Sequence, residues 1–599
     1  MLSINRNGHC IVRRSVHLSA SVAGHTHGHN PRFRPSEFHK VGKFHKELPK
    51  DRKPTHIIVG AGAAGCVLAN RLTENPDNLV VLMEAGPKDH WWNWKINMPA
   101  ALMYNLCDDK YNWFYHTLPQ QHMNNRVFYW PRGRVWGGST SLNAMAYVRG
   151  HPCDYDRWEK QGAKNWSFKH CLPYFKKSQS HELSTGPNDL FRGHDGPLKV
   201  SQGKCENPLH KAFIESGKQQ GIGYTEDMNG YRQEGCGPMD MTIHNGIRQS
   251  TSRAYLQPIL HRENLITTER VMTTKVLFHG KKAIGVEFIR QFDFPFADHI
   301  DSATREKLYC EDAVILAGGA INSPQLLLLS GTCQALEAIY KDHLEIYVQQ
   351  ACKLPITLYN KSSWKFPHNM IRIGLQWFMN QTGLGASSHL ESGGFARTTD
   401  KIEHPDIQFH FLPSTVHDDG RVVGNCHAYQ VHVGPMRSQA HGTVRLTSTD
   451  PRFHPVMDPN YLSSEQDLIE FRRCIELSRD LFAQKAFDPY RGEELAPGAD
   501  CKTDEDIDNF VRSKAASAYH PSCTCKMGSS SDDMAVVDGE TMGVHGLENL
   551  KVVDASVMPS IVSGNLQAAT IMLAEKASDI IMGKKPLEPQ QPEIWKPGK

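Results

Sequence analysis

The sequence predicts an α/β protein with a Rossmann-like nucleotide-binding domain into which a second domain is inserted. One observation is a short apolar run that enters a glycine-rich turn near the N-terminus, and another is that glycine-rich turns recur far along the chain. The length agrees, because 599 residues are enough for roughly two to four domains. The apolar fraction of 39% is sufficient for a large core.

The N-terminal segment, residues 1–36, differs in charge from the rest of the chain. It contains five arginines and serine but no acidic residue, which is the pattern of a mitochondrial transit peptide; a disordered histidine-rich tail is the alternative. The most apolar candidate for a membrane span, Ala313 to Ser330, is interrupted by Asn322 and Pro324. Any membrane contact is therefore expected to be peripheral.

Charge and cysteine content argue against a nucleic-acid-binding protein and against a secreted disulfide-rich protein. The 67 Lys+Arg against 64 Asp+Glu give a net charge of +3, so we expect no nucleic-acid partner. The 15 cysteines are not regularly spaced, as those of a secreted disulfide framework would be. Cys523 and Cys525 have no further ligands at zinc spacing, and no metal site is expected.

The first glycine motif follows an apolar run at residues 56–59. Gly60, Gly62 and Gly65 form Gly-x-Gly-x-x-Gly before a helical pattern, and a second apolar run ends at Glu84. Such glycines permit a tight turn and let backbone N–H groups approach a pyrophosphate at the N-terminus of the helix. Glu84 would accept hydrogen bonds from the ribose. The motif predicts a dinucleotide without choosing between FAD and NAD.

Three later sequence motifs follow the first glycine motif along the chain, at residues 133–150, 313–327 and 550–565. With the first motif they resemble, in order, the glucose–methanol–choline family of FAD-dependent oxidoreductases. The resemblance implies bound FAD and an α+β substrate-binding domain, an antiparallel sheet with helices. The FAD is expected to be non-covalent, because Leu142 stands where some relatives have a flavin-linked histidine. The implied cofactor-binding residues are Gly60, Gly62, Gly65, Glu84, Gly137, Gly138, Asn143, Gly318 and Asp554.

The resemblance also implies the catalytic residues. Ala518-Tyr519-His520-Pro521 is similar to the family's catalytic-histidine motif, and Asn565 matches the family's second catalytic position. An imidazole with a pKa of about 6.5 can accept the hydroxyl proton of an alcohol at neutral pH. Asn565 would donate a hydrogen bond to the same oxygen. Three other histidines have no such motif: His343, His389 and His410.

The runs at 389–395, 405–413 and 517–528 resemble the choline-oxidising members. The resemblance implies oxidation of choline to betaine aldehyde, with electrons passed to a quinone or another acceptor at the matrix side of the mitochondrial inner membrane. A quaternary ammonium is held by aromatic faces and a carboxylate. Glu391 is the candidate carboxylate and Tyr519 one aromatic wall; a solvated loop acid and a packing residue are the alternatives.

Only ten residues, 332–341, separate Gly331 from Asp342, where the family has a further helix, strand and flavin loop. A catalytically impaired isoform is therefore a second hypothesis, and an alcohol oxidase with another substrate is a third.

The predicted organisation is a transit peptide at 1–36, an FAD-binding region at 54–345 partly interleaved with the substrate domain, a substrate-binding region at 346–530, a segment completing the FAD domain at 531–585, and a tail at 586–599.

Overall fold

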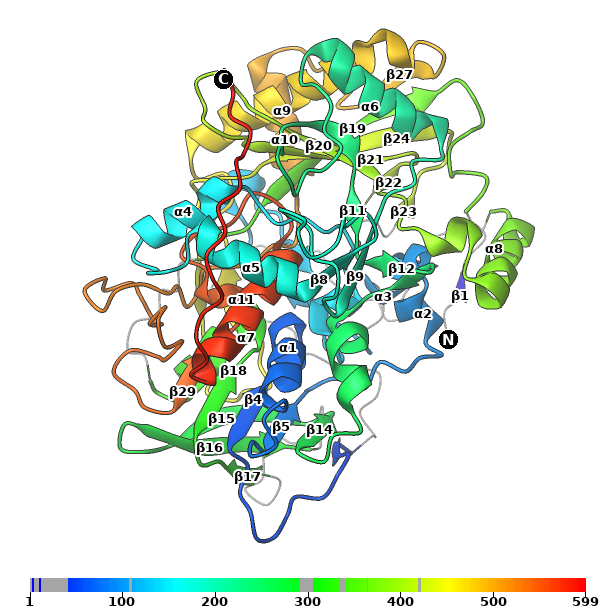
Figure 1. The fold of residues 1–599 in the computed structure, drawn as a ribbon. Helices are drawn as coiled ribbons and strands as arrows, with labels where there is room; N and C mark the ends of the chain where they lie inside the picture. The colour runs from blue at the N-terminus through cyan, green and yellow to red at the C-terminus, as the bar shows by residue number, and fades with distance from the viewer. Residues whose placement is uncertain are drawn as a thin grey trace, which may run out of the picture.

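Figure 1 shows the fold in a computed structural model. The transit peptide expected at 1–36 lies outside the described residues, except for the backbone of two short strands. The ten-residue connection after Gly331 is also described only at its ends. The described residues are 41–106, 110–290, 305–332, 340–362, 365–417 and 422–598, with strands β1 (Ser3–Ile4) and β2 (Cys10–Ile11).

A six-stranded sheet in the order β29-β18-β4-β5-β14-β3 forms the lower part of the molecule in Figure 1. The first five strands are parallel, and only β3 is antiparallel to its neighbour. Since strands from the start, middle and end of the chain meet here, the predicted Rossmann-like fold is confirmed. Their bounds are β3 (Lys43–Phe44), β4 (His56–Val59), β5 (Val80–Met83), β14 (Leu265–Glu269), β18 (Ala313–Leu316) and β29 (Leu550–Val552).

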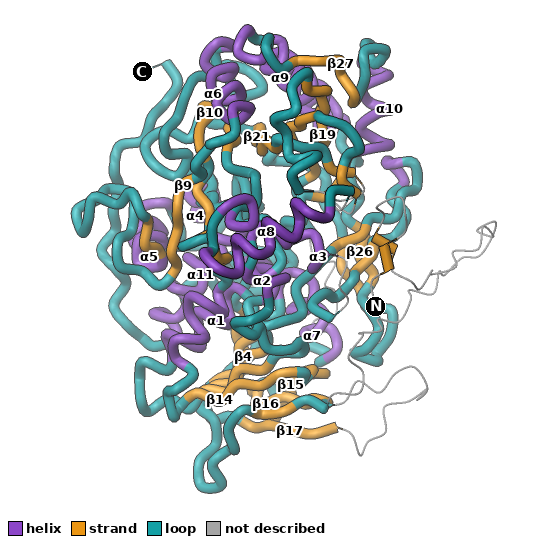
Figure 2. Tube along the Cα trace, turned by 90° about the vertical axis from the view of Figure 1, so that its right-hand side faces the viewer, coloured by secondary structure: helices purple, strands orange, loops and turns teal. Residues whose placement is uncertain are grey.

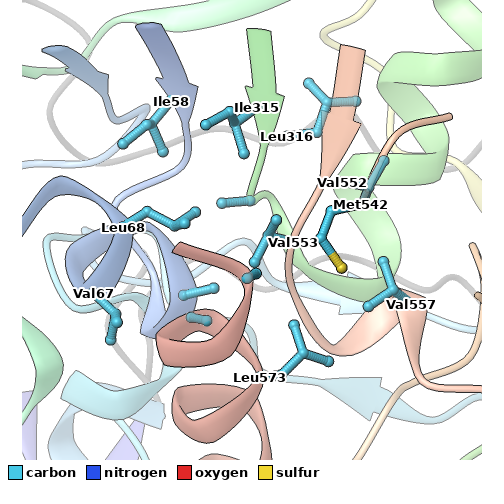
Figure 3. Packing of buried hydrophobic residues seen from close by; sticks show 14 of the residues in the cluster. Ile58, Val67, Leu68, Ile315, Leu316, Met542, Val552, Val553, Val557 and Leu573 are labelled. Atoms are coloured by element: carbon cyan, nitrogen blue, oxygen red, sulfur yellow. The ribbon is translucent and has the colours of Figure 1, made fainter. Parts of the chain in front are cut away.

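Helices α1 (Ala63–Leu72) and α11 (Leu566–Ile581) pack against each other on one face of this sheet. Figure 3 shows side chains of β4, β18, α1 and α11 meeting in a continuous apolar layer. Ile58, Leu68 and Leu573 are all fully buried in it. A parallel strand covered on both faces is apolar along its whole length, and β4, β5 and β18 are buried at every position.

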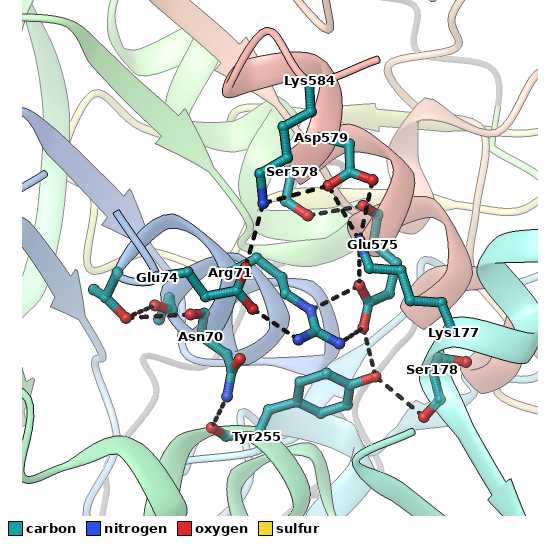
Figure 4. A network of polar contacts seen from close by, with 12 residues as sticks. Asn70, Arg71, Glu74, Lys177, Ser178, Tyr255, Glu575, Ser578, Asp579 and Lys584 are labelled. Carbon is teal, nitrogen blue, oxygen red and sulfur yellow. Dashed lines mark hydrogen bonds and ion pairs between the residues drawn. The ribbon is translucent and has the colours of Figure 1, made fainter. Parts of the chain in front are cut away.

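A buried carboxylate joins the helices around this layer (Figure 4). Both oxygens of Glu575 accept hydrogen bonds from Arg71, at 2.7 and 2.8 Å, and one also accepts from the Tyr255 hydroxyl at 2.9 Å. Lys177 of α5 (Phe168–Ser178) lies 3.3 Å from the same carboxylate. Because removing one partner of a buried pair costs about 3–5 kcal/mol, this network holds α11 firmly against α1.

The second sheet lies at the top of Figure 1 and is antiparallel, in the order β10-β20-β21-β24-β19-β27, with β28 on β19. Helices α6 (Pro208–Gln220) and α9 (Glu465–Ala483) pack on it. This is the antiparallel sheet with helices that was predicted. Its strands are β10 (Gly235–Pro238), β19 (Leu344–Cys352), β20 (Ser392–Ala396), β21 (Ile407–Leu412), β24 (Ala428–Pro435), β27 (Arg491–Ala496) and β28 (Ala516–Ser517).

The two sheets draw on interleaved stretches of the chain, since β10 comes from within the region assigned to nucleotide binding. The domain boundaries given above stay predictions. Of the helices described here, none is both long enough and apolar enough to cross a bilayer. Further helices include α2 (Trp94–Asn97), α4 (Pro152–Lys160), α7 (Gly319–Leu329), α8 (Pro367–Asn380) and α10 (Asp504–Lys514).

Candidate active site between the two sheets

The turn between β4 and α1 depends on its glycines for two different reasons. A Cβ atom at Gly65 would lie 1.8 Å from the Gly60 carbonyl oxygen, and Gly60 has a φ of +105°. These two positions therefore tolerate no side chain. At Gly62, by contrast, the nearest atom to an added Cβ is the Ala317 oxygen at 3.9 Å. Gly62 thus has free space on its Cβ side, where a ligand could approach the turn, as pyrophosphate binding requires.

The second glycine turn lies directly on the first. The Gly137 N–H donates to the Ala61 carbonyl at 2.7 Å, and a Cβ at Gly138 would lie 2.7 Å from the Gly62 Cα. Glu84, which directly follows β5, contacts the first turn: its carboxylate accepts from the Ala61 N–H at 2.9 Å. Burial raises the pKa of Glu84 to about 7. The first two predicted nucleotide-binding motifs are therefore neighbours in space.

Asp554 connects the turns that follow β18 and β29. Its carboxylate accepts from the Gly319 N–H at 2.8 Å, the Ser323 hydroxyl at 2.6 Å and the Ser556 N–H at 2.8 Å. The Gly318 N–H donates to the same Ser323 hydroxyl at 3.0 Å. Asp554 is thus a structural link between the C-terminal ends of two neighbouring strands of the parallel sheet, and its predicted contact with the cofactor stays a prediction.

Asn143 connects the second glycine turn to the start of α11. Its amide nitrogen donates to Gln567 Oε1 at 2.6 Å, and its amide oxygen accepts from Arg248 at 2.8 Å. Gln567 Nε2 is buried and has no hydrogen-bond partner among the residues that the structure describes. An orphan buried donor costs free energy unless a ligand accepts from it. With the open backbone at Gly62, this donor shows that the site fits a dinucleotide cofactor.

The structure places the two predicted catalytic side chains together. His520 follows β28, Asn565 is the N-cap residue of α11, and Asn565 Nδ2 lies 3.2 Å from His520 Nε2. Asn565 Oδ1 accepts from Gln408 at 3.1 Å and lies 3.3 Å from His410 Nε2. Since these contacts occupy the amide oxygen, the amide nitrogen must face His520.

The hydrogen bonds of His343 determine the tautomer of His520. His343 Nε2 lies 3.0 Å from the Met436 carbonyl, which only accepts, so a neutral His343 carries its proton there and accepts at Nδ1. His520 Nδ1 lies 3.0 Å from that atom and must donate to it. Desolvation lowers the pKa of His343 to about 4 and that of His520 well below 6.5. Neutral His520 therefore carries its lone pair at Nε2, where it accepts from the Asn565 amide at 3.2 Å.

The Asp342 carboxylate holds the backbone of both histidines. One carboxylate oxygen accepts from the N–H groups of His520 at 2.7 Å and His343 at 2.9 Å. The other accepts from the Ser517 hydroxyl at 2.6 Å and from the Tyr461 hydroxyl. Burial raises the pKa of Asp342, and these donors lower it again. The loop that carries His520 is therefore fixed on both sides.

His343 and His410 are the site residues that the sequence analysis missed. His410 was set aside for want of a motif, yet it shares β21 with Gln408, and both contact Asn565. Residues two apart on a strand point to the same face, so the polar positions within Ile407–Leu412 were a usable signal. His343 offered no comparable signal, because its partners come from distant segments.

The two predicted substrate residues, Glu391 and Tyr519, make separate sets of contacts. Glu391 directly precedes β20, and its carboxylate oxygens accept from the Cys205 N–H at 2.8 Å and the Ser387 hydroxyl at 2.6 Å. Tyr519 has a φ of +63°, and its carbonyl accepts from Arg132 at 2.8 Å. Such a φ is uncommon for a residue with a side chain and is often found at functional sites.

One side-chain group in the described parts of the chain has the composition of a metal site: His151, Cys153 and His404. The two imidazoles stack with ring centroids 4.6 Å apart and an interplanar angle of 21°. A metal ion must lie in the plane of each coordinating ring, and stacked rings direct their lone pairs along nearly parallel planes. This geometry does not favour an ion.

Comparisons with known proteins agree with this geometry. The sequence model of the GMC oxidoreductase family matches residues 55–345 and 438–574. Mitochondrial choline dehydrogenase of Mus musculus is 55% identical over 564 residues, which cover 91% of this chain and 92% of the relative. Oxygen-dependent choline dehydrogenase of Staphylococcus xylosus is 45% identical, covering 91% and 97%.

Among solved structures, pyridoxine 4-oxidase from Mesorbium loti superposes with a TM-score of 0.78 at 27% identity, covering 89% of this chain and all of the other. Formate oxidase superposes with a TM-score of 0.79 at 23% identity, covering 89% and 99%, and this supports the fold alone. These comparisons, the parallel sheet and the paired His520 and Asn565 lead to one conclusion: the chain belongs to the GMC oxidoreductase family.

Proposed function

We propose that this protein binds FAD non-covalently and oxidises choline to betaine aldehyde, the first step of glycine betaine synthesis. The observation that carries the proposal is the unprotonated Nε2 of His520, held at hydrogen-bond distance from the Asn565 amide so that both can contact one substrate oxygen. Choline dehydrogenases more than 50% identical to this chain support the substrate. The residues that would hold FAD are those of the two glycine turns, with Glu84, Asn143 and Gln567.

In this proposal His520 accepts the hydroxyl proton of choline at Nε2, while the Asn565 N–H donates to the same oxygen. A neutral imidazole is ready for this at pH 7, and a positioned base contributes about 10²–10⁴-fold to the rate. Bound FAD would supply the acceptor for the hydride that leaves the alcohol carbon. The His343 acceptor keeps the His520 N–H on the side away from the substrate.

Glu391 is proposed to bind the trimethylammonium group, with Tyr519 as one wall. A carboxylate about 4 Å from a cation contributes roughly 4 kcal/mol at an effective dielectric near 20, before desolvation. Glu391→Gln removes the charge; its amide oxygen can still accept from the Cys205 N–H, while its amide nitrogen would donate to the Ser387 hydroxyl in place of accepting from it. We expect KM for choline to rise by about tenfold or more with a smaller change in kcat. The control substrate is 3,3-dimethylbutan-1-ol, a primary alcohol in which an uncharged tert-butyl group replaces the trimethylammonium group of choline. An equal loss for both substrates would reject the ammonium role.

We further propose that the protein acts in the mitochondrion, on the matrix side of the inner membrane, and passes electrons to a quinone. The support is the acid-free, arginine-containing N-terminus and the mitochondrial names of the mouse and human relatives. A respiratory acceptor predicts that added quinone reoxidises the reduced enzyme faster than dissolved oxygen does.

The decisive experiment is anaerobic mixing of the purified protein with choline. Bleaching of the flavin absorbance is expected. A protein that stays colourless when supplied with FAD would instead support the impaired isoform. Bleaching by simple alcohols but not by choline would support a different alcohol substrate.

A further inference from the structure

Helix α8 (Pro367–Asn380) lies at the surface of the molecule (Figure 2) and is held by one face only. Ile373 and Trp377 are buried, and the Trp377 indole donates to the Gly246 carbonyl at 2.8 Å. Trp377 packs in a small apolar cluster with Met98 and Ala101. This face alone accounts for the attachment of the helix to the protein.

The opposite face of α8 is also apolar, where a surface helix normally carries polar side chains. At 100° per residue, four apolar side chains fall within one third of the helix circumference, and this third is turned away from Ile373 and Trp377. They are exposed by 56–75%. This α8 face consists of Ile371, Leu375, Phe378 and Met379.

More aromatic surface lies nearby. Trp91 and Trp92, exposed by 75% and 59%, lie just before the short helix α2, separated from it only by Asn93. Figures 1 and 2 both show α2 beside α8, and Trp94 of α2 packs against the cluster that holds Trp377. Tryptophan is enriched at the level of lipid headgroups, because its ring is apolar and its N–H is polar.

The stretch of sequence that carries α8 has only positive charges. Residues 346–390 contain no Asp or Glu. They contain four cationic residues: Lys353, Lys361, Lys365 and Arg372. An apolar helix face with basic residues beside it is the composition of a helix that lies in the plane of an anionic membrane surface. A second copy of the chain fits less well, because a two-fold contact would bring the same cations together.

We infer that the α8 face docks this protein on an anionic lipid bilayer, with the four apolar side chains inserted among the headgroups. Docking of this kind is peripheral and does not depend on the proposed reaction. It would place the protein where a lipid-soluble electron acceptor is found.

Flotation with lipid vesicles tests this inference on the full flavoprotein. Wild type should float with vesicles of phosphatidylcholine and phosphatidylglycerol, float less with phosphatidylcholine alone, and detach at high salt. The double variant Leu375→Ser/Phe378→Ser should bind at least about tenfold more weakly, because two inserted apolar side chains are lost. Arg372→Gln should reduce only the preference for the anionic vesicles.

A matched control removes two exposed apolar residues from the far end of the antiparallel sheet. Ile469→Ser/Leu495→Ser, on α9 and β27, should float like wild type. Flavin content and choline-dependent bleaching, measured without vesicles, should be equal in all variants and separate docking from the reaction. The inference is overturned if wild type binds no vesicles, or if both double variants lose binding equally. A gel-filtration shift from dimer to monomer in the α8 variant alone, without vesicle binding, would assign the face to a second copy.

Discussion

The nucleotide-binding end and the substrate end of this site are made from different parts of the polypeptide. At the nucleotide end, the turns around Gly60 and Gly137 shape the site with backbone atoms, which leave no room for a side chain at Gly65 or Gly138. At the substrate end, side chains of His343, His520 and Asn565 form the site. A backbone site is specified by short local motifs, whereas a side-chain site depends on long-range packing.

The largest expected effect is at the nucleotide end. In Gly65→Ala the new Cβ would lie 1.8 Å from the Gly60 carbonyl oxygen, so the turn must move. We expect loss of bound flavin, measured as flavin per chain after purification. Gly374→Ala, in α8, is the matched control: no atom lies within 4 Å of its added Cβ, and the substitution should stabilise the helix by up to about 1 kcal/mol. Full flavin content in Gly65→Ala would show that the turn is more tolerant than the geometry indicates.

At the substrate end a single substitution should spare the cofactor and impair the chemistry. His520→Gln should slow anaerobic flavin reduction by at least about 100-fold while flavin content stays normal. The control is His244→Gln, since His244 lies exposed on a short strand. If stopped-flow reduction by choline were unchanged, His520 would not be the base.

A smaller effect is expected at the positioning residue. His343→Leu removes the acceptor for the His520 N–H, and we expect flavin reduction to slow by about tenfold. Because His343 also lowers the pKa of His520, the acid limb of the pH–rate profile should move to higher pH. His343→Gln retains an acceptor oxygen and should restore much of the rate. A uniform loss in both variants, with an unchanged pH profile, would indicate a purely structural role.

The smallest expected effect is a difference between the two ends in how their folding stability depends on pH. Burial lowers the pKa of His210 to about 3 and that of His389 to about 4, so the unfolded chain binds more protons below pH 6.5. Their contribution to stability is complete above pH 6.5 and falls on acidification, by about 1.4 kcal/mol per group at pH 5.5. Glu84, with a pKa raised to about 7, changes in the opposite sense and gains stability over the same interval.

Hydrogen exchange at pH 7 and pH 5.5, corrected for intrinsic rates, measures this difference. Protection should fall in β20 and β21 relative to β4 and β5. His56 of β4, whose pKa burial also lowers, reduces the contrast without reversing it. Parallel changes in both sheets would mean that the protein responds to acid as one unit.

The same contrast explains how much could be predicted from the sequence. The parallel sheet and the positions of Gly60, Gly62 and Gly65 follow from local spacing: Gly65 must be a glycine because a Cβ there would meet the Gly60 carbonyl of its own turn. The pairing of His520 with Asn565 followed from family motifs. His343 could not be found in this way, since its role is set by the Met436 carbonyl 93 residues away. The exposed α8 face was also not foreseen, because apolar spacing alone does not tell which side of a helix is covered.

The direct contact between the Nδ1 atoms of His343 and His520 limits how many protons the two histidines can hold. Only one of these two atoms can bear hydrogen at a time, since two N–H groups pointing at each other would repel. The pair can therefore take up a single proton from an alcohol and no more. In the proposed reaction this proton must leave the pair before the next alcohol is activated, either to solvent or with the electrons to the acceptor, so its escape route is part of the catalytic cycle.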